Sequence, residues 1–123
     1  MPEQRESGQR VAGRLYATLR VLQFLARTGV PRPTVSEELK DKHSPRDRIQ
    51  ALGVDLFADL VTAVQEGRHA AAMGEVFRAL PAVVPPRKAA LDKNLGEWDL
   101  TEFNAGYRAQ LTALQEALPE VLR

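Results

Sequence analysis

Apolar residues recur at intervals of three and four along most of this sequence, which is the spacing of one face of a helix. The first such segment predicts a helix over residues 9–28, ended by Gly29 and by the prolines that follow it. Its predicted core side carries Val11, Leu15, Leu19, Leu22 and Ala26. No segment alternates apolar and polar residues for more than a few positions, so we expect no sheet.

The middle of the chain contains two helix starts. Thr34 and Glu37 have capping-box spacing and predict a short helix over residues 35–41. Ser44, followed by Pro45, is a favourable start for a long helix that reaches about residue 66, with Gly67 as its stop. The apolar stripe of that helix is Ile49, Leu52, Leu56, Leu60, Ala63 and Val64.

A fourth helix is predicted over residues 69–80, then a rigid connector over 81–86 and a short helix over 87–94. Asp99 and Glu102 are expected to cap a last helix that ends near residue 118. Its stripe is Phe103, Gly106 or Tyr107, Gln110, Leu111, Leu114 and Leu118. The pattern therefore predicts an all-α helical bundle of four main helices with one or two short ones, forming one domain over residues 9–123 after a flexible N-terminus at residues 1–8.

The composition limits the kinds of functional site that this chain is expected to hold. The 123 residues include no cysteine, which excludes disulfides and thiolate zinc sites, and the two histidines, His43 and His69, lack metal-binding spacing. No P-loop, dinucleotide-binding fingerprint or nucleophile elbow occurs. We therefore expect a protein that is not an enzyme and takes no metal or cofactor. With no apolar run long enough for a membrane span and no secretory signal pattern, a cytoplasmic location is expected.

Charge is distributed unevenly although its sum is only +1. Residues 1–48 hold ten Lys and Arg against six Asp and Glu, whereas residues 49–123 hold seven against ten. On a helical wheel, four arginines of the first helix share one arc with Phe24: Arg10, Arg14, Arg20 and Arg27. A second basic group follows in the next loop, formed by Lys40, Lys42, Arg46 and Arg48. Such faces suit phosphates, but they also occur as merely solvated faces, and Phe24 would equally suit a protein partner.

Two short motifs suggest a family. Residues 13–19 read Gly-Arg-Leu-Tyr-Ala-Thr-Leu, with Leu-Gln at 22–23, and residues 103–110 follow the pattern Phe-x-x-Gly-Tyr-x-x-Gln. In this order and at about this separation, they resemble the C-terminal helical domain of the large subunit of type I-C CRISPR surveillance (Cascade) complexes, which is also made as a separate small subunit. The resemblance covers about residues 13–114. It departs in the middle, where Asp-Lys-His-Ser-Pro stands at 41–45 in place of Asp-Arg-Tyr and a small-residue turn.

The resemblance implies a non-catalytic small subunit that stacks with further copies of itself along the belly of the complex, on the backbone and large subunits. It would help to hold the heteroduplex of guide RNA and target DNA and the displaced DNA strand. The residues expected to make sequence-independent phosphate contacts are Arg20, Arg27, Arg32, Lys40, Lys42, Arg46 and Arg48. The alternative is a stand-alone helical adaptor that binds a protein through the face bearing Phe24 and the arginines.

The motif residues themselves are expected to be structural: Gly13, Arg14, Leu15, Tyr16, Gln23, Phe103, Gly106, Tyr107 and Gln110. A glycine inside a helix costs about 1 kcal/mol relative to alanine, so it is favoured where two helices cross closely. We therefore expect Gly13 and Gly106 to mark such a crossing, with the tyrosines beside it. The two glutamines would be buried amides bonded to each other or to backbone.

Overall fold

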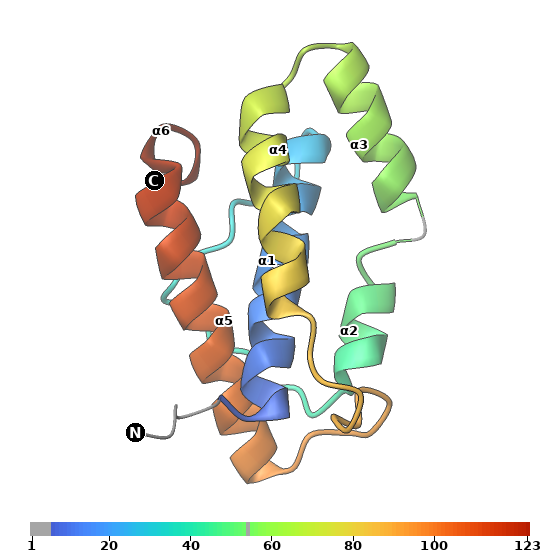
Figure 1. The fold of residues 1–123 in the computed structure, drawn as a ribbon, viewed down its shortest axis with the longest axis vertical. Helices are drawn as coiled ribbons and strands as arrows, with labels where there is room; N and C mark the ends of the chain where they lie inside the picture. The colour runs from blue at the N-terminus through green and yellow to red at the C-terminus, as the bar shows by residue number, and fades with distance from the viewer. Residues whose placement is uncertain (1–5, 54) are drawn as a thin grey trace.

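Two long helices, α1 (Gly8–Ala26) and α5 (Glu97–Ala117), lie side by side along the molecule (Figure 1). The computed structural model describes residues 6–53 and 55–123, and these contain no strand, so the predicted all-α fold is confirmed. The shorter elements are α2 (Pro45–Gln50), α3 (Leu56–Gln65), α4 (Ala70–Ala79), a 3-10 turn (Leu80–Val83) and α6 (Pro119–Leu122). α3 and α4 both pack on α1.

α1 and α5 cross at the two motif glycines, as the sequence predicts. A Cβ on Gly13 would lie 1.9 Å from the Phe103 carbonyl oxygen, and one on Gly106 would lie 1.8 Å from the Arg10 carbonyl oxygen. Both distances are far inside van der Waals contact, so only glycine permits this approach. The Tyr16 ring packs beside the crossing, 5.7 Å from the centre of Phe103 and 5.8 Å from that of Tyr107.

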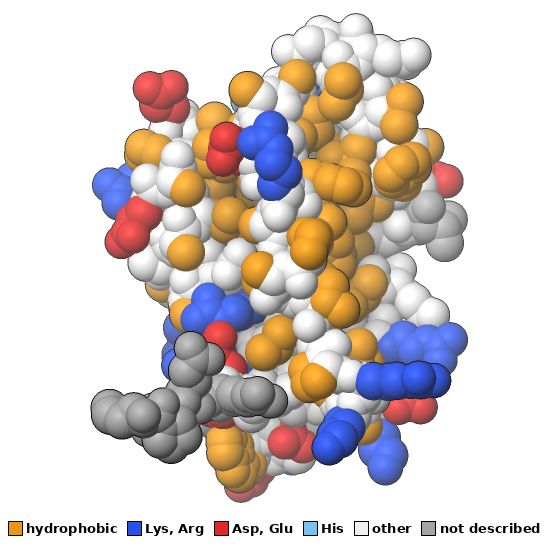
Figure 2. Space-filling model, viewed as in Figure 1, with side chains coloured by type: hydrophobic (Ala, Val, Ile, Leu, Met, Phe, Trp, Pro, Cys, Tyr) orange, Lys and Arg blue, Asp and Glu red, His pale blue; other side chains and the backbone are white. Residues whose placement is uncertain are grey.

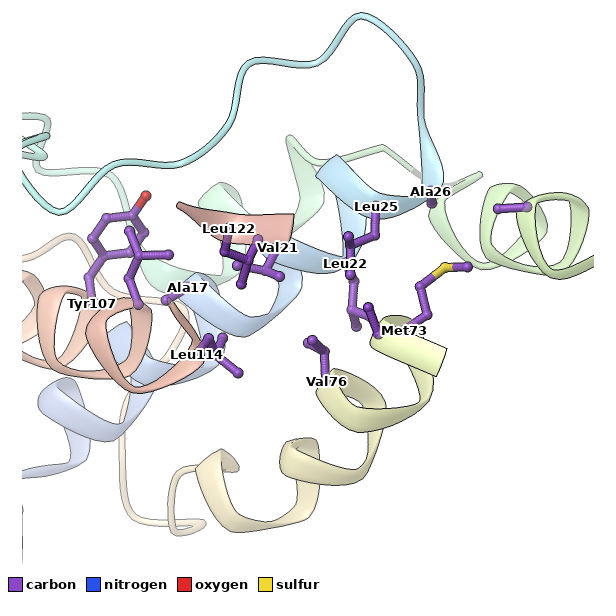
Figure 3. Close-up of a cluster of buried hydrophobic side chains, with 13 residues drawn as sticks. Ala17, Val21, Leu22, Leu25, Ala26, Met73, Val76, Tyr107, Leu114 and Leu122 are labelled. Carbon is purple, nitrogen blue, oxygen red and sulfur yellow. The ribbon is translucent and has the colours of Figure 1, made fainter. Parts of the chain in front are cut away.

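The main core lies around the C-terminal half of α1 (Figure 3). Val21, Leu22 and Leu25 are almost fully buried there against Val76 of α4 and Leu114 of α5. The predicted core side of α1 is only partly right. Val11, Leu15 and Leu19 are half-buried, and the full burial of Ala12, Ala17, Val21 and Leu25 widens the buried arc, because α1 has neighbours on several sides.

The predicted long helix over 45–66 is wrong as a single element. It starts as expected, with the Ser44 hydroxyl accepting from the Asp47 N–H, but α2 ends at Gln50 and α3 begins at Leu56. Gly53 lies between them with a φ of +101°, a left-handed conformation that stops a helix. The Leu52 carbonyl accepts hydrogen bonds from Gln23 on α1 and from Arg27, the residue that follows α1. On the predicted stripe, Val64 is exposed.

The two predicted short helices do not form. Over residues 35–41, the side chain of Asn104 on α5 bonds the backbone N–H and carbonyl of Leu39, which replaces helical hydrogen bonds. Residues 87–94 form turns, and the Leu91 carbonyl there accepts a hydrogen bond from the Arg46 N–H instead of a helical one. In each loop, therefore, a backbone group is satisfied by a tertiary contact rather than within a helix.

The helix ends also differ from the expected ones. α1 begins at Gly8 with the Ser7 hydroxyl as its N-cap, so described residues of the predicted flexible 1–8 segment take part in the helix, while 1–5 lie outside the described residues. α5 begins at Glu97, after Gly96 as N-cap, rather than after Asp99. Glu102 accepts a hydrogen bond from Ser7 at 2.8 Å instead of capping α5.

Candidate nucleic-acid interface

Arg20 lies in an internal cluster rather than on an open face. Its guanidinium pairs with the Glu37 carboxylate and donates to the Tyr107 hydroxyl at 2.8 Å. Burial raises the pKa of Tyr107, and the nearby Arg20 charge opposes that rise. Burial by itself would lower the pKa of Arg20. The contacts with Tyr107 and the hydrogen-bonded Glu37 outweigh that effect, so the pKa of Arg20 is raised. A phosphate would have to displace these partners to reach Arg20.

Arg27 and Arg48 likewise make contacts within the protein. Arg27 pairs with Asp59 of α3 and donates to the Leu52 carbonyl at 2.8 Å. Arg48 is only 8% exposed, donates to the backbone carbonyls of Asp41 and His43, and lies 5.2 Å from the centre of the Phe103 ring. Burial lowers its pKa. Both side chains therefore hold loops in place.

The other four predicted phosphate-binding residues, Arg32, Lys40, Lys42 and Arg46, are exposed. Two backbone hydrogen bonds join the segment carrying Lys42 and Arg46 to the loop before α5. The Arg46 N–H donates to the Leu91 carbonyl at 2.8 Å, and the Leu95 N–H donates to the Lys42 carbonyl at 2.9 Å. These bonds bring together cations about fifty positions apart in the sequence.

We call the resulting group the loop basic surface: Lys42, Arg46, Arg87, Lys88 and Lys93. All five are exposed, and none forms an ion pair with another described residue. Figure 2 shows Lys and Arg side chains gathered at the lower right, over α2 and the loop before α5. Asp41, Asp47 and Asp92 lie on the same two segments, so the excess positive charge is small. Such a surface suits weak contact with phosphate groups that lie in a row.

The sequence reading missed Arg87, Lys88 and Lys93. The sequence does show these three cations within seven positions, just after Pro85 and Pro86, and such a cluster could have been singled out as basic. The sequence does not show that they lie near Lys42 and Arg46. That proximity depends on backbone hydrogen bonds between two segments far apart in the chain.

The motif residues lie in or beside the core, as expected. The Gln110 amide oxygen accepts from Arg14 at 3.2 Å, and Arg14 also pairs with Glu6 at 2.9 Å. Gln23 donates to the Leu52 carbonyl at 3.2 Å. The expectation of two buried amides bonded to each other or to backbone is met only in part, because Gln23 bonds backbone but is half-buried, and Gln110 is buried but bonds the Arg14 side chain. Leu15 is half-buried.

Phe24, the centre of the alternative adaptor face, is half-buried and packs against the main core. Within residues 6–53 and 55–123, no cluster of three or more His, Asp or Glu side chains is placed to hold a metal ion. No helix in those same ranges has the length and apolar character needed to cross a membrane.

Comparison with known proteins finds no matching family, no similar curated protein and no similar solved structure.

Proposed function

We propose that this chain is the small subunit of a type I-C-like CRISPR surveillance complex and that it holds nucleic acid by its phosphates through the loop basic surface. The observation that carries the proposal is the meeting of the two motifs. Gly13 and Tyr16 of the first motif contact Phe103 and Tyr107 of the second at one helix crossing, and Gly106 of the second motif lies against the Arg10 backbone, just before the first motif. Motifs that form one packing unit support a shared fold better than two separate short matches do.

The loop basic surface supports the phosphate-binding part of the proposal. Five exposed cations on two mutually bonded segments, the start of α2 with the residues before it and the loop before α5, can each release a counterion from a nucleic-acid backbone. Their small charge excess favours weak binding by the isolated chain. Several copies placed along one strand would bind more tightly, because each added contact is intramolecular.

The binding experiment uses fluorescence anisotropy of labelled single-stranded and duplex DNA over a range of salt concentrations. A variant with Lys42→Glu, Lys88→Glu and Lys93→Glu should weaken binding and flatten the salt dependence, since each lost phosphate contact removes about 0.7–0.9 from the logarithmic slope. The matched control carries Arg68→Glu, Arg108→Glu and Arg123→Glu, which changes net charge equally but lies outside the loop basic surface. Equal loss in both variants would contradict the assigned surface.

Assembly is tested by co-expressing the chain with the backbone and large subunits of a type I-C complex and a guide RNA. Co-purification with that ribonucleoprotein, and loss of target-strand opening when the loop basic surface is reversed, is the expected result. A chain that stays free while the rest of the complex assembles would contradict the proposed identity.

A further inference from the structure

An apolar groove opens between α3 and α4. Both helices pack on α1, but they diverge from the turn that joins them (Figure 1). The groove has a volume of about 480 Å³ and leaves four large side chains exposed: Phe57 by 68%, Val61 by 47%, Val64 by 52% and Phe77 by 49%. Figure 2 shows hydrophobic side chains gathered between these two helices. A contiguous apolar surface of this kind is typical of an interaction site.

The opposite end of the molecule carries another exposed aromatic residue. Trp98 is 63% exposed in the first turn of α5, where the exposed carboxylates Glu97 and Asp99 flank it in sequence. The α5 start and the α3–α4 turn lie at opposite ends of the long axis (Figure 1). Neither end can therefore cover the other within one chain.

The two ends are complementary in chemistry. Of the described residues that line the groove, Arg78 is the charged one. Its side chain is 74% exposed and pairs with Glu75 at 3.3 Å, an exposed ion pair that contributes little and that an incoming carboxylate could replace. A tryptophan flanked by two carboxylates offers an apolar body for the groove and negative charge for Arg78. Tryptophan is also one of the residue types enriched among the anchors of protein interfaces.

We propose that the α3–α4 groove of one copy of this chain receives Trp98 of a second copy. Because the two surfaces differ and lie at opposite ends, the contact is heterologous and repeats head to tail, giving an open stack rather than a closed pair. The contact is small compared with the roughly 800 Å² per partner of a stable interface, so free copies associate weakly and reversibly. Stacking of copies belongs to the proposed function, and this inference names its contact. Neither Trp98 nor the groove belongs to the loop basic surface, so failure of either proposal is distinguishable from failure of the other.

Trp98 is the single tryptophan of the chain, so its fluorescence reports directly on this contact. The wild-type emission should shift to shorter wavelength as the concentration rises into the millimolar range, in step with sedimentation. Val61→Glu, which puts a charge into the groove, should weaken association roughly tenfold or more, as should Trp98→Ala. Val84→Glu is the control, because Val84 is 60% exposed but does not line the groove. Circular dichroism verifies that each variant is folded.

Mixing the two disrupted variants decides the geometry. The Val61→Glu chain keeps Trp98, and the Trp98→Ala chain keeps the groove and contributes no tryptophan emission. A head-to-tail contact predicts that adding the second to the first restores a heterodimer and shifts the emission. An unshifted emission in the mixture, as a two-fold groove-to-groove dimer or binding of a different partner would give, overturns the proposal. So does wild-type protein that stays monomeric at millimolar concentration.

Discussion

Single residues decide how closely the two long helices approach each other. Gly13→Ala would place a methyl group 1.9 Å from the Phe103 carbonyl oxygen, so α1 and α5 would have to separate along their crossing. We expect a loss of roughly 2–3 kcal/mol or more in the free energy of unfolding, measured by urea denaturation. The same loss is expected for Gly106→Ala.

Gly74→Ala is the matched control. Gly74 also lies inside a helix, but the nearest atom to its added Cβ would be the flexible Arg78 guanidinium at 3.4 Å. Alanine there should stabilise the protein by up to about 1 kcal/mol through helix propensity. Equal effects of the two substitutions would show that the crossing imposes no special constraint.

Tyr107 gives stability a dependence on alkaline pH. Burial in the folded chain raises its pKa above the ordinary value of 10.0 that applies when the chain is unfolded. Above that pH the unfolded state loses its proton first, so the stabilisation, complete below pH 10, falls as pH rises toward the folded pKa. The midpoint of thermal unfolding should therefore decrease above about pH 10.

Tyr107→Phe removes this titration while keeping the ring, so it should show a shallower decrease over the same pH range. Tyr16, whose pKa burial also raises, leaves part of the effect in place. A variant with the wild-type slope would assign the alkaline loss of stability to other groups.

At the scale of elements, the break between α2 and α3 depends on contacts from Arg27, the residue that follows α1. Arg27 bonds both Asp59 of α3 and the Leu52 carbonyl beside Gly53, where it also occupies the space next to that glycine. Arg27→Ala should reduce the free energy of unfolding by about 1–2 kcal/mol, because the carbonyl and the carboxylate both lose a charged donor.

Arg68→Ala provides the comparison for that substitution. Arg68 pairs with Glu66 at the surface, where ion pairs contribute little, so its removal should cost less than about 0.5 kcal/mol. Hydrogen exchange should locate the effect of Arg27→Ala in α2 and α3. Loss of protection spread evenly over all helices would instead mean that Arg27 supports the fold as a whole.

At the scale of the whole molecule, the exposed positive charge does not follow the division of the sequence into a basic N-terminal part and an acidic C-terminal part. Three cations of the more basic N-terminal part, Arg20, Arg27 and Arg48, are taken up by internal contacts. Three cations of the more acidic part, Arg87, Lys88 and Lys93, join the exposed surface. The net charge of +1 is thus compatible with a local basic surface, but that surface draws on both parts of the chain.

The exposed apolar surface of α3 also depends on how the helices pack, and not only on the spacing of apolar residues. Val64 and Leu60 belong to one predicted stripe, yet Leu60 packs against the core and Val64 is 52% exposed. Period alone cannot show how wide the contact on a helix is. Because α3 packs on α1 and diverges from α4, part of its stripe faces solvent and forms the groove.

The sequence by itself determined the helical class, the ends of α1 and α4 to within two residues, the Ser44 cap and the crossing at Gly13 and Gly106. These features depend on local spacing, on capping chemistry and on the absence of a side chain at glycine, all of which can be identified from residues near one another in the sequence. Tertiary structure decided where the middle helix breaks, which predicted short helices are replaced by loops, and which cations are exposed. Each of those outcomes depends on a donor or acceptor from a distant segment, such as Asn104 on Leu39 or Arg27 on Leu52, and no local pattern carries that information.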